Sequence, residues 1–396
     1  MSTLLPLLLP PRPFLPVGGR LAAFYAAYFF AVGIHLPFWP LWLESRGMSA
    51  TEIGVLLAAS LWARVFANPL AGHIADSRGR RKGLMIILAG LSIAVFILFA
   101  VARSFWPLLV LCVLFGGVFS ALMPLGENLA MLTAYARRLD YGRIRLWGSL
   151  TFIVASIAGG RLLVESPPSA IPWAILAGLL ATFAACFLLP EVPERAAGEG
   201  VRPLRGLLSD ANFRLFLVAG SLIHASHGVY YGFATLHWRQ AGLGSDLIGG
   251  LWAEAVVAEI VLFAFSGAVV SRLGPAGLLM LGAAGAVVRW TALGLSSAVP
   301  VLVVEQTLHA LTFGATHLGA MHFIARAAPP GVSAQAQALY SSIGMGASLG
   351  IAMLVSGGLY DRLGGYAFLA CTVLALGGFV ACVFLFRRWN GGRLEL

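Results

Sequence analysis

The sequence has few charged residues and few cysteines. Only 11% of its 396 residues are charged and 59% are hydrophobic, whereas a soluble protein carries about 25% charged residues. The composition therefore excludes an ordinary soluble domain. No P-loop, HExxH, GxSxG or EF-hand pattern is present, which argues against ATP hydrolysis and covalent catalysis. The cysteines lie in apolar runs without metal or redox spacing and are interpreted as core residues: Cys112, Cys186, Cys371 and Cys382.

Long apolar runs fill the chain from about residue 20 to residue 390. Each is long enough to cross a bilayer, which takes about 20 helical residues. Backbone groups in lipid require helices or a closed barrel, and runs of this length exclude the alternating pattern of barrel strands. We therefore predict an all-α membrane protein with twelve transmembrane helices, at 21–43, 51–74, 83–102, 105–133, 143–164, 170–190, 213–238, 246–271, 276–297, 299–326, 333–359 and 365–387.

The basic residues that give the net charge of +10 are distributed unevenly between the two sides of the predicted membrane topology. With the N-terminus in the cytoplasm, 18 of the 26 Lys and Arg residues fall on the cytoplasmic side and 5 outside. This bias predicts that both termini are cytoplasmic and makes a nucleic-acid partner unnecessary. In the Pro-rich tail Arg12 follows the apolar residues, whereas a signal peptide carries its charge first.

The chain contains an internal repeat. Residues 45–79 align without a gap with residues 240–274, and Arg64 aligns with Glu259. A duplicated membrane unit is typical of a transporter whose site lies between two parallel-repeat halves. We predict two six-helix halves around a central cavity, with the boundaries 1–20 cytoplasmic tail, 21–190 N-terminal half, 191–212 cytoplasmic linker, 213–387 C-terminal half and 388–396 cytoplasmic tail.

The loop after the second predicted helix resembles the hallmark of the major facilitator superfamily. Residues 72–81 read GHIADSRGRR, close to the family pattern Gly-x-x-x-Asp-Arg-x-Gly-Arg-Arg. The resemblance implies a cytoplasmic gate whose carboxylate faces a helix N-terminus or an Arg across the interface between the halves. A plain basic loop would explain the arginines but not the glycine and aspartate. The predicted gating residues are Gly72, Asp76, Gly79, Arg80 and Arg81.

Several charges lie inside predicted helices, where each costs at least about 2.5 kcal/mol to insert. They are Arg64, Glu127, Arg145, Glu254, Glu259, Arg289 and Glu305. Six histidines are also predicted to face the interior: His35, His224, His227, His309, His317 and His322. So many polar groups in one bundle indicate a hydrated cavity.

Glu127 and Arg145 lie nine residues before and after the hairpin centre near Ala136, so they reach a similar depth on antiparallel helices. The stretch 141–149, YGRIRLWGS, resembles the lactose-permease branch and, more closely, the bacterial phenylpropionate permeases. The resemblance implies that this pair binds substrate; the alternative is a structural ion pair. We add four further predicted substrate contacts: Arg64, His35, His227 and Tyr231.

A second polar group is predicted in the C-terminal half. Glu305, His309, Thr312 and Thr316 share one helical face, which Arg289 on the preceding helix can approach. In the lactose-permease branch a helix-eight Glu, a helix-nine Arg and a helix-ten His couple protons. By resemblance Glu259, Arg289, His309 and Glu305 take these roles here. The alternative is a polar network that only stabilises the bundle. No carboxylate or cysteine accompanies the histidines of helix seven, so no metal or other cofactor is predicted.

These features predict a proton-coupled symporter of the bacterial inner membrane, a monomer that takes up a small organic solute. The resemblance implies an aromatic carboxylate such as phenylpropionate. Alternatives within the same fold are an exporter and a sugar or nucleoside symporter. An intramembrane enzyme would need a nucleophile–base pair or metal ligands on facing helices, and the sequence offers none.

Overall fold

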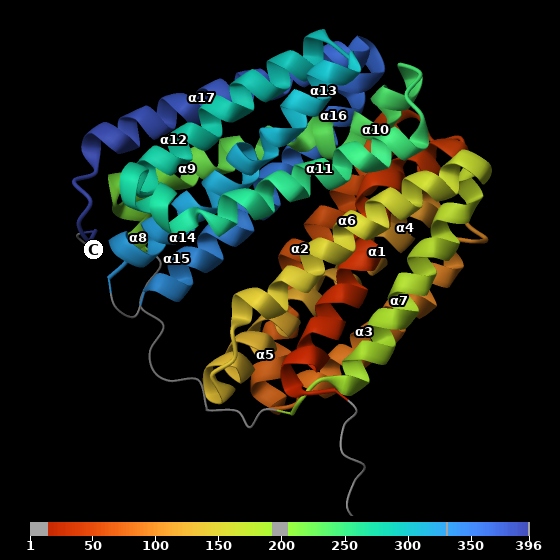
Figure 1. Ribbon diagram of the computed structural model, residues 1–396, viewed down its shortest axis with the longest axis horizontal. Helices are drawn as coiled ribbons and strands as arrows, with labels where there is room; N and C mark the ends of the chain where they lie inside the picture. The colour runs from red at the N-terminus through yellow and green to blue at the C-terminus, as the bar shows by residue number, and fades with distance from the viewer. Residues whose placement is uncertain (1–14, 192–204, 330–331, 395–396) are drawn as a thin grey trace, which may run out of the picture.

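The computed structural model describes residues 15–191, 205–329 and 332–394. All regular structure in these ranges is helical, and Figure 1 shows the helices running roughly side by side. Nine helical stretches in the described ranges are long and apolar enough to cross a membrane. This observation agrees with an all-α membrane protein, although several of the predicted helices are divided into shorter ones.

The first set of helices gathers in the lower right of Figure 1, coloured red to yellow-green. It comprises α1 (Val17–Ser45), α2 (Ala50–Arg78), α3 (Arg81–Leu98), α4 (Phe105–Ser120), α5 (Leu122–Arg137), α6 (Tyr141–Glu165), the short 3₁₀ turn η1 (Pro168–Ala170) and α7 (Ile171–Leu188).

The second set lies in the upper left, coloured green to blue. It comprises α8 (Arg205–Ser209), α9 (Ala211–Ala225), α10 (Gly228–Gln240), α11 (Ser245–Ala264), α12 (Ser266–Leu295), α13 (Val299–Thr307), the π-helix η2 (Ala310–Ala315), α14 (Thr316–Ala327), α15 (Ser333–Leu339), the π-helix η3 (Tyr340–Ala347), α16 (Ser348–Leu363), the 3₁₀ turn η4 (Gly364–Ala367) and α17 (Phe368–Arg388).

The sequence repeat is visible in the backbone. Gly47 and its counterpart Gly242 have φ values of 83° and 88°, and Gly79 and Gly274 have 63° and 64°. A positive φ costs glycine little because it has no Cβ. The positive φ thus recurs after α1 and α10, as expected for a duplicated unit. The two later glycines differ in ψ, which is 21° at Gly79 and 175° at Gly274, so the chain turns differently there.

The predicted helix 213–238 is broken between α9 and α10. The Ile223 carbonyl, which a continuous helix would give to the His227 N–H, instead accepts from the Ser226 hydroxyl at 2.7 Å and from His227 Nδ1 at 2.9 Å. Side chains that bond nearby carbonyls in this way compete with the helical ladder. The break places the His227 side chain among buried groups, and for this reason it matters for the site.

Four other predicted helices are interrupted in the structure, the first being 105–133, which is divided at Ala121 between α4 and α5. The segment 299–326 contains the π-helix η2, and 333–359 contains the π-helix η3. The helix expected at 246–271 is divided at Phe265, and α12 then continues through a kink at Gly274. Such interruptions leave no signature in an apolar composition.

The two helix sets meet closely at one end of the bundle. We call this the far end, where α1 and α10 end and α2 and α11 begin. There α6 packs on α11 and α2 packs on α16. A Cβ built on Gly54 would lie 2.9 Å from Gly357 Cα, and one built on Gly160 would lie 3.2 Å from Gly249 Cα. The glycines thus permit backbone contact between the sets.

At the near end, where α1 begins and α17 ends, the two sets of ribbons diverge (Figure 1). A Cβ added to Gly72 in α2, or to its repeat counterpart Gly267 in α12, would meet nothing within 4 Å. The same two repeats are therefore tightly packed at one end and open at the other.

Candidate substrate and proton site

Arg289 of α12 is the centre of a buried polar group and is 0% exposed. Its Nε donates to Glu305 at 2.9 Å and its Nη2 donates to Gln306 at 2.5 Å. Its Nη1 lies 3.0 Å from His309 Nδ1 and 3.1 Å from Thr312 Oγ1. The prediction that Arg289 approaches this helical face is therefore confirmed. A guanidinium with five N–H donors can serve all four partners at once.

Aromatic rings and an amide complete the surroundings of Arg289. The guanidinium carbon lies 4.4 Å from the ring centre of Tyr230 and 4.7 Å from that of Trp290. Gln306 Nε2 donates to the Tyr230 hydroxyl at 3.0 Å and to the Leu251 carbonyl at 2.7 Å. Sequence reasoning did not assign Gln306 or Tyr230 to the site. The sequence did offer one signal for Gln306, which is a neutral amide next to Glu305 in an otherwise apolar helix.

The Arg289 contact determines which nitrogen of His309 carries a proton. Because a guanidinium only donates, His309 Nδ1 must accept, so that the neutral ring carries its proton on Nε2. That nitrogen lies 3.7 Å from Glu259 Oε2. The Glu259 side chain is 17% exposed and that of His309 is 9% exposed. A chain of groups therefore runs from partly accessible Glu259 through His309 to buried Arg289 and Glu305.

His227, a predicted substrate contact, is 1% exposed and has protein partners for both ring nitrogens. Its Nδ1 donates to the Ile223 carbonyl, and its Nε2 lies 3.3 Å from Thr312 Oγ1. The structure therefore places it behind the cavity surface, because the break after α9 turns it inward. Tyr231 is partly exposed and stacks on the His227 ring, with ring centres 5.4 Å apart.

His224, three residues before His227, bonds a different group. Its Nε2 lies 2.8 Å from the Tyr340 hydroxyl. The two histidines therefore do not converge on a common point. Among the described residues no group of three or more His, Cys, Asp or Glu side chains is arranged to hold a metal ion.

Arg145 of α6 lies against aromatic rings, with its guanidinium carbon 4.3 Å from the ring centre of Phe29 and 5.4 Å from that of Tyr25. Within the described residues no ion pair of 4.0 Å or less joins it to Glu127, so the structural ion pair that was the alternative interpretation is not formed here. The two charges are still close enough to interact. Arg145 also interacts electrostatically with Glu259 of the second helix set.

Arg64 stands fourteen residues after the start of α2, as Glu259 does after the start of α11. Although it lies at the middle of a 29-residue helix, its side chain is exposed. It interacts electrostatically with Tyr28 and His35 of α1, so it faces the bundle. The structure is therefore open to water near mid-helix. His35 itself stacks on Trp39, with ring centres 5.2 Å apart.

The predicted gating loop has a different partner from the one expected. Asp76 pairs with Arg81, five residues along in the same loop, at 2.5 Å. Asp76 therefore has a partner within its own half, and the predicted gate contact, with a helix N-terminus or an Arg across the interface, stays a prediction. The positive φ of Gly79 ends α2 and returns the chain toward Asp76. Arg80 is exposed and precedes α3.

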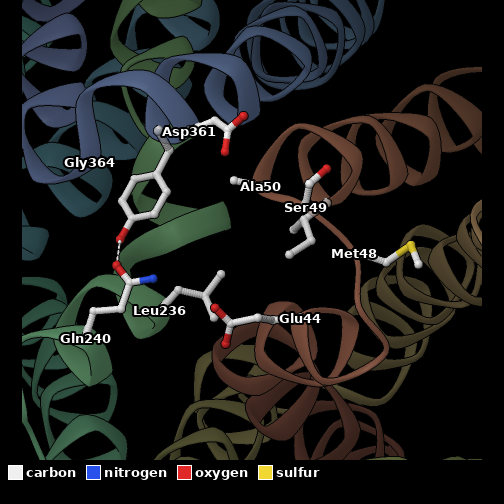
Figure 2. A pocket seen from close by; sticks show the side chains of 10 residues that line it. Glu44, Met48, Ser49, Ala50, Leu236, Gln240, Asp361 and Gly364 are labelled. Carbon is white, nitrogen blue, oxygen red and sulfur yellow. Dashed lines mark hydrogen bonds between the residues drawn. The ribbon is translucent and has the colours of Figure 1, made fainter.

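A cavity of about 390 Å³ lies at the far end, between α1 and α2 on one side and α10 and α16 on the other. Figure 2 shows Glu44 and Asp361 on opposite sides of it and the hydrogen bond from the Tyr360 hydroxyl to Gln240. None of the predicted substrate or proton residues lines it. Its lining residues are Glu44, Met48, Ser49, Ala50, Ile53, Leu236, Gln240, Tyr360, Asp361 and Gly364.

Comparisons with known proteins agree with these features. Residues 19–370 match the sequence model of the MFS_1 like family. The chain is 34% identical to a protein of Escherichia coli (strain K12) described as a probable 3-phenylpropionic acid transporter, over 90% of this chain and 94% of that protein. It is 31% identical to the maltose permease of Geobacillus stearothermophilus over 86% of each chain.

Similarity to a solved structure supports the fold alone. The crystal structure of the nucleoside transporter NupG superposes with a TM-score of 0.81 at 15% identity, covering 95% of this chain and 100% of that one.

Proposed function

Because the chain belongs to the MFS_1-like family of the major facilitator superfamily, we propose that this transporter takes up a small organic carboxylate together with protons. The transporter class follows from the family. The coupling and the substrate are our proposal. The observation that carries the proposal is the buried chain of Glu259, His309, Arg289 and Glu305 in the second helix set.

In this proposal Glu259 carries the coupled proton. It is the member of the buried chain nearest to accessible space, and it faces the N–H of His309. His309 is held in one tautomer by Arg289, so its Nε2–H points to the Glu259 carboxylate and orients it, while Glu259 exchanges its own proton with water. Glu305 balances the charge of Arg289.

The proposed substrate is an aromatic carboxylate such as 3-phenylpropionate. Its carboxylate pairs with Arg145 or Arg64, and Glu127 and His35 contribute to the same side of the site. Tyr231 lines the opposite side, held by His227 behind it. The name of the Escherichia coli relative supports this substrate class. Similarity to the maltose permease favours a sugar as the alternative substrate.

Transport proceeds by alternating access in this proposal. Twelve transmembrane passes form two halves, 21–190 and 213–387, which rock against one another in a monomer. The tight glycine contacts at the far end and the open glycines at the near end support a state that faces the near end. The charge bias in the sequence assigns the near end, and both termini, to the cytoplasmic side of a bacterial inner membrane. Most of the linker 191–212 and of the tail 1–20 lies outside the described residues.

The gating loop is proposed to act at this near end. Asp76 pairs with Arg81 while the near end is open. Closure would bring Gly72 against the second helix set. Gly79 and Arg80 form the turn between Asp76 and Arg81, so that Asp76 can change its partner without movement of the rest of α2.

Uptake into liposomes containing the purified chain tests the function. An inward gradient of 3-phenylpropionate should make the external medium more alkaline as protons enter with substrate. Substrate entry without alkalinisation would refute symport, and maltose entry without carboxylate entry would favour the sugar alternative. An exporter would instead carry substrate into the lumen of everted vesicles, driven by a proton gradient in the opposite direction.

Glu259→Gln tests the assigned proton carrier. A glutamine keeps the size and polarity but carries no exchangeable carboxyl proton. We expect uphill accumulation to fall by about tenfold or more, while exchange of labelled for unlabelled substrate continues. Glu254→Gln on the same helix is the control and should accumulate substrate normally. Equal accumulation by Glu259→Gln and the wild type would remove Glu259 from the coupling step.

A further inference from the structure

Three rings of the second helix set form a ladder. The ring centres of His309 and Phe313 lie 5.4 Å apart with planes 8° from parallel, and those of Phe313 and His317 lie 6.3 Å apart with planes 6° from parallel. In an α-helix a residue four positions further on is rotated by about 40°. The π-helix η2, which contains Phe313, winds with a wider turn and offsets this rotation. The ladder therefore keeps one direction from His309 to His317.

His317 differs from His224, His227 and His309 in having no hydrogen-bond partner among the described residues. His224, His227 and His309 each have a hydrogen bond to a side chain or carbonyl. The Nδ1 atom of His317 is buried without a hydrogen-bond partner, and neither of its nitrogens bonds another described residue. The ring is nevertheless partly exposed. A polar group left unsatisfied in this way requires a partner from outside the protein, either water or a ligand.

Arg145 from the first helix set interacts electrostatically with His317. The faces of its guanidinium are covered by Phe29 and Tyr25, which leaves the N–H edge for a ligand. No hydrogen bond joins this edge to another side chain in the described part of the chain. Arg145 and His317 thus offer two unused donors from different helix sets.

We propose that His317 is a substrate-binding residue that holds the substrate carboxylate together with Arg145. One carboxylate oxygen accepts from a ring N–H of His317, and the carboxylate pairs with the guanidinium. Phe313 is a positioning residue that fixes the plane of the His317 ring. This inference rests on the proposed function and adds that a monocarboxylate bridges the two helix sets through α6 and α14.

Transport of labelled 3-phenylpropionate by the full-length chain in liposomes tests the assignment. His317→Phe keeps the ring and its stacking on Phe313 but removes both nitrogens. We expect its KM for the acid to rise by about tenfold or more, as for loss of a hydrogen bond to a charged group, with a smaller change in maximal rate. His317→Gln retains a donor and should raise KM less. His322→Phe, which changes an exposed histidine of the same helix, is the matched control.

Competition by uncharged 3-phenylpropionamide separates carboxylate recognition from general damage. Its inhibition constant should be nearly the same for the wild type and His317→Phe. His317→Leu provides a second variant without a donor if His317→Phe is not recovered folded. A wild-type KM for the acid in either variant would overturn the role of His317. Failure of the wild type to transport or bind any carboxylate would instead refute the proposed function.

Discussion

At the residue scale, the main question is how a buried Arg289 is stabilised in an apolar helix. A lone charge in this position is costly to insert. Here the guanidinium has an ion pair with Glu305, two further side-chain acceptors and His309 around it, and Tyr230 and Trp290 cover its faces. The group is therefore cooperative, since removal of one member leaves the others buried without partners.

Removal of Arg289 alone should be strongly destabilising. Arg289→Ala leaves Glu305 buried and unpaired, so we expect the free energy of unfolding to fall by about 3–5 kcal/mol. The double variant with Glu305→Ala should recover part of this loss, because no uncompensated charge remains. Thermal unfolding in detergent measures both, with Arg143→Ala at an exposed position as the control. Equal losses in the single and double variants would contradict the stated coupling.

Residue spacing predicted the second polar group better than the first. Glu305, His309 and Thr312 recur at helical intervals, and this pattern fixes which face they share whatever their rotamers. Counting residues from a hairpin fixes only the depth of Glu127 and Arg145, not the direction of a long side chain. Arg145 stacks on Phe29, a contact that depends on how α1 packs against α6.

At the element scale, paired glycines decide which helices can touch. Gly249 and Gly250 are adjacent in α11, yet a Cβ on Gly249 would lie 3.2 Å from Gly160 Cα and one on Gly250 would meet nothing within 4 Å. In α16 Gly357 faces α2 closely, while the neighbouring Gly358 meets nothing within 4 Å. The same arrangement therefore occurs at the α6–α11 contact and at the α2–α16 contact.

The neighbouring glycines provide a matched test of far-end closure. Gly249→Ala should force α11 away from α6 and shift the population toward a state open at the far end. Gly250→Ala should leave the population of this open state unchanged. The change can be measured as labelling of a cysteine introduced at Ile53, a buried residue that lines the far-end cavity; we expect it to react severalfold faster in Gly249→Ala. The same labelling rate in both variants would show that this contact does not control closure.

Helix existence was predictable from the sequence, but helix continuity was not. Long apolar runs require helices because lipid offers the backbone no hydrogen bonds. The break after α9 arises from competition of Ser226 and His227 for one carbonyl. The π-helices η2 and η3 also leave the apolar pattern intact. Such irregularities lie beside the polar group, where the ladder of His309, Phe313 and His317 depends on one of them.

At the scale of the whole molecule, the two repeats share their turns and differ in their charges. The repeat-related glycines share positive φ angles, while Arg64 and Glu259 place opposite charges at equivalent positions of α2 and α11. The expected division of roles between the halves is modified by the geometry. Arg145 of the first set interacts electrostatically with Glu259 and His317 of the second, so the proposed substrate and proton groups would act across the two sets.

A reversible link across the far end tests whether the two sets must separate there. Arg161 of α6 and Asp246 of α11 form an exposed ion pair of 3.8 Å between the sets. In the double variant Arg161→Cys and Asp246→Cys, a short bifunctional thiol reagent should join the helices and reduce uptake to background, because the far end can no longer open. The four native cysteines are buried and should react slowly.

Reduction of the link should restore uptake, and each single-cysteine variant treated in the same way should keep it. Binding of substrate from the near end should persist in the linked protein, since that end stays open. Full uptake by fully linked protein would show that transport does not require the far end to open, and alternating access between these two sets would then be wrong.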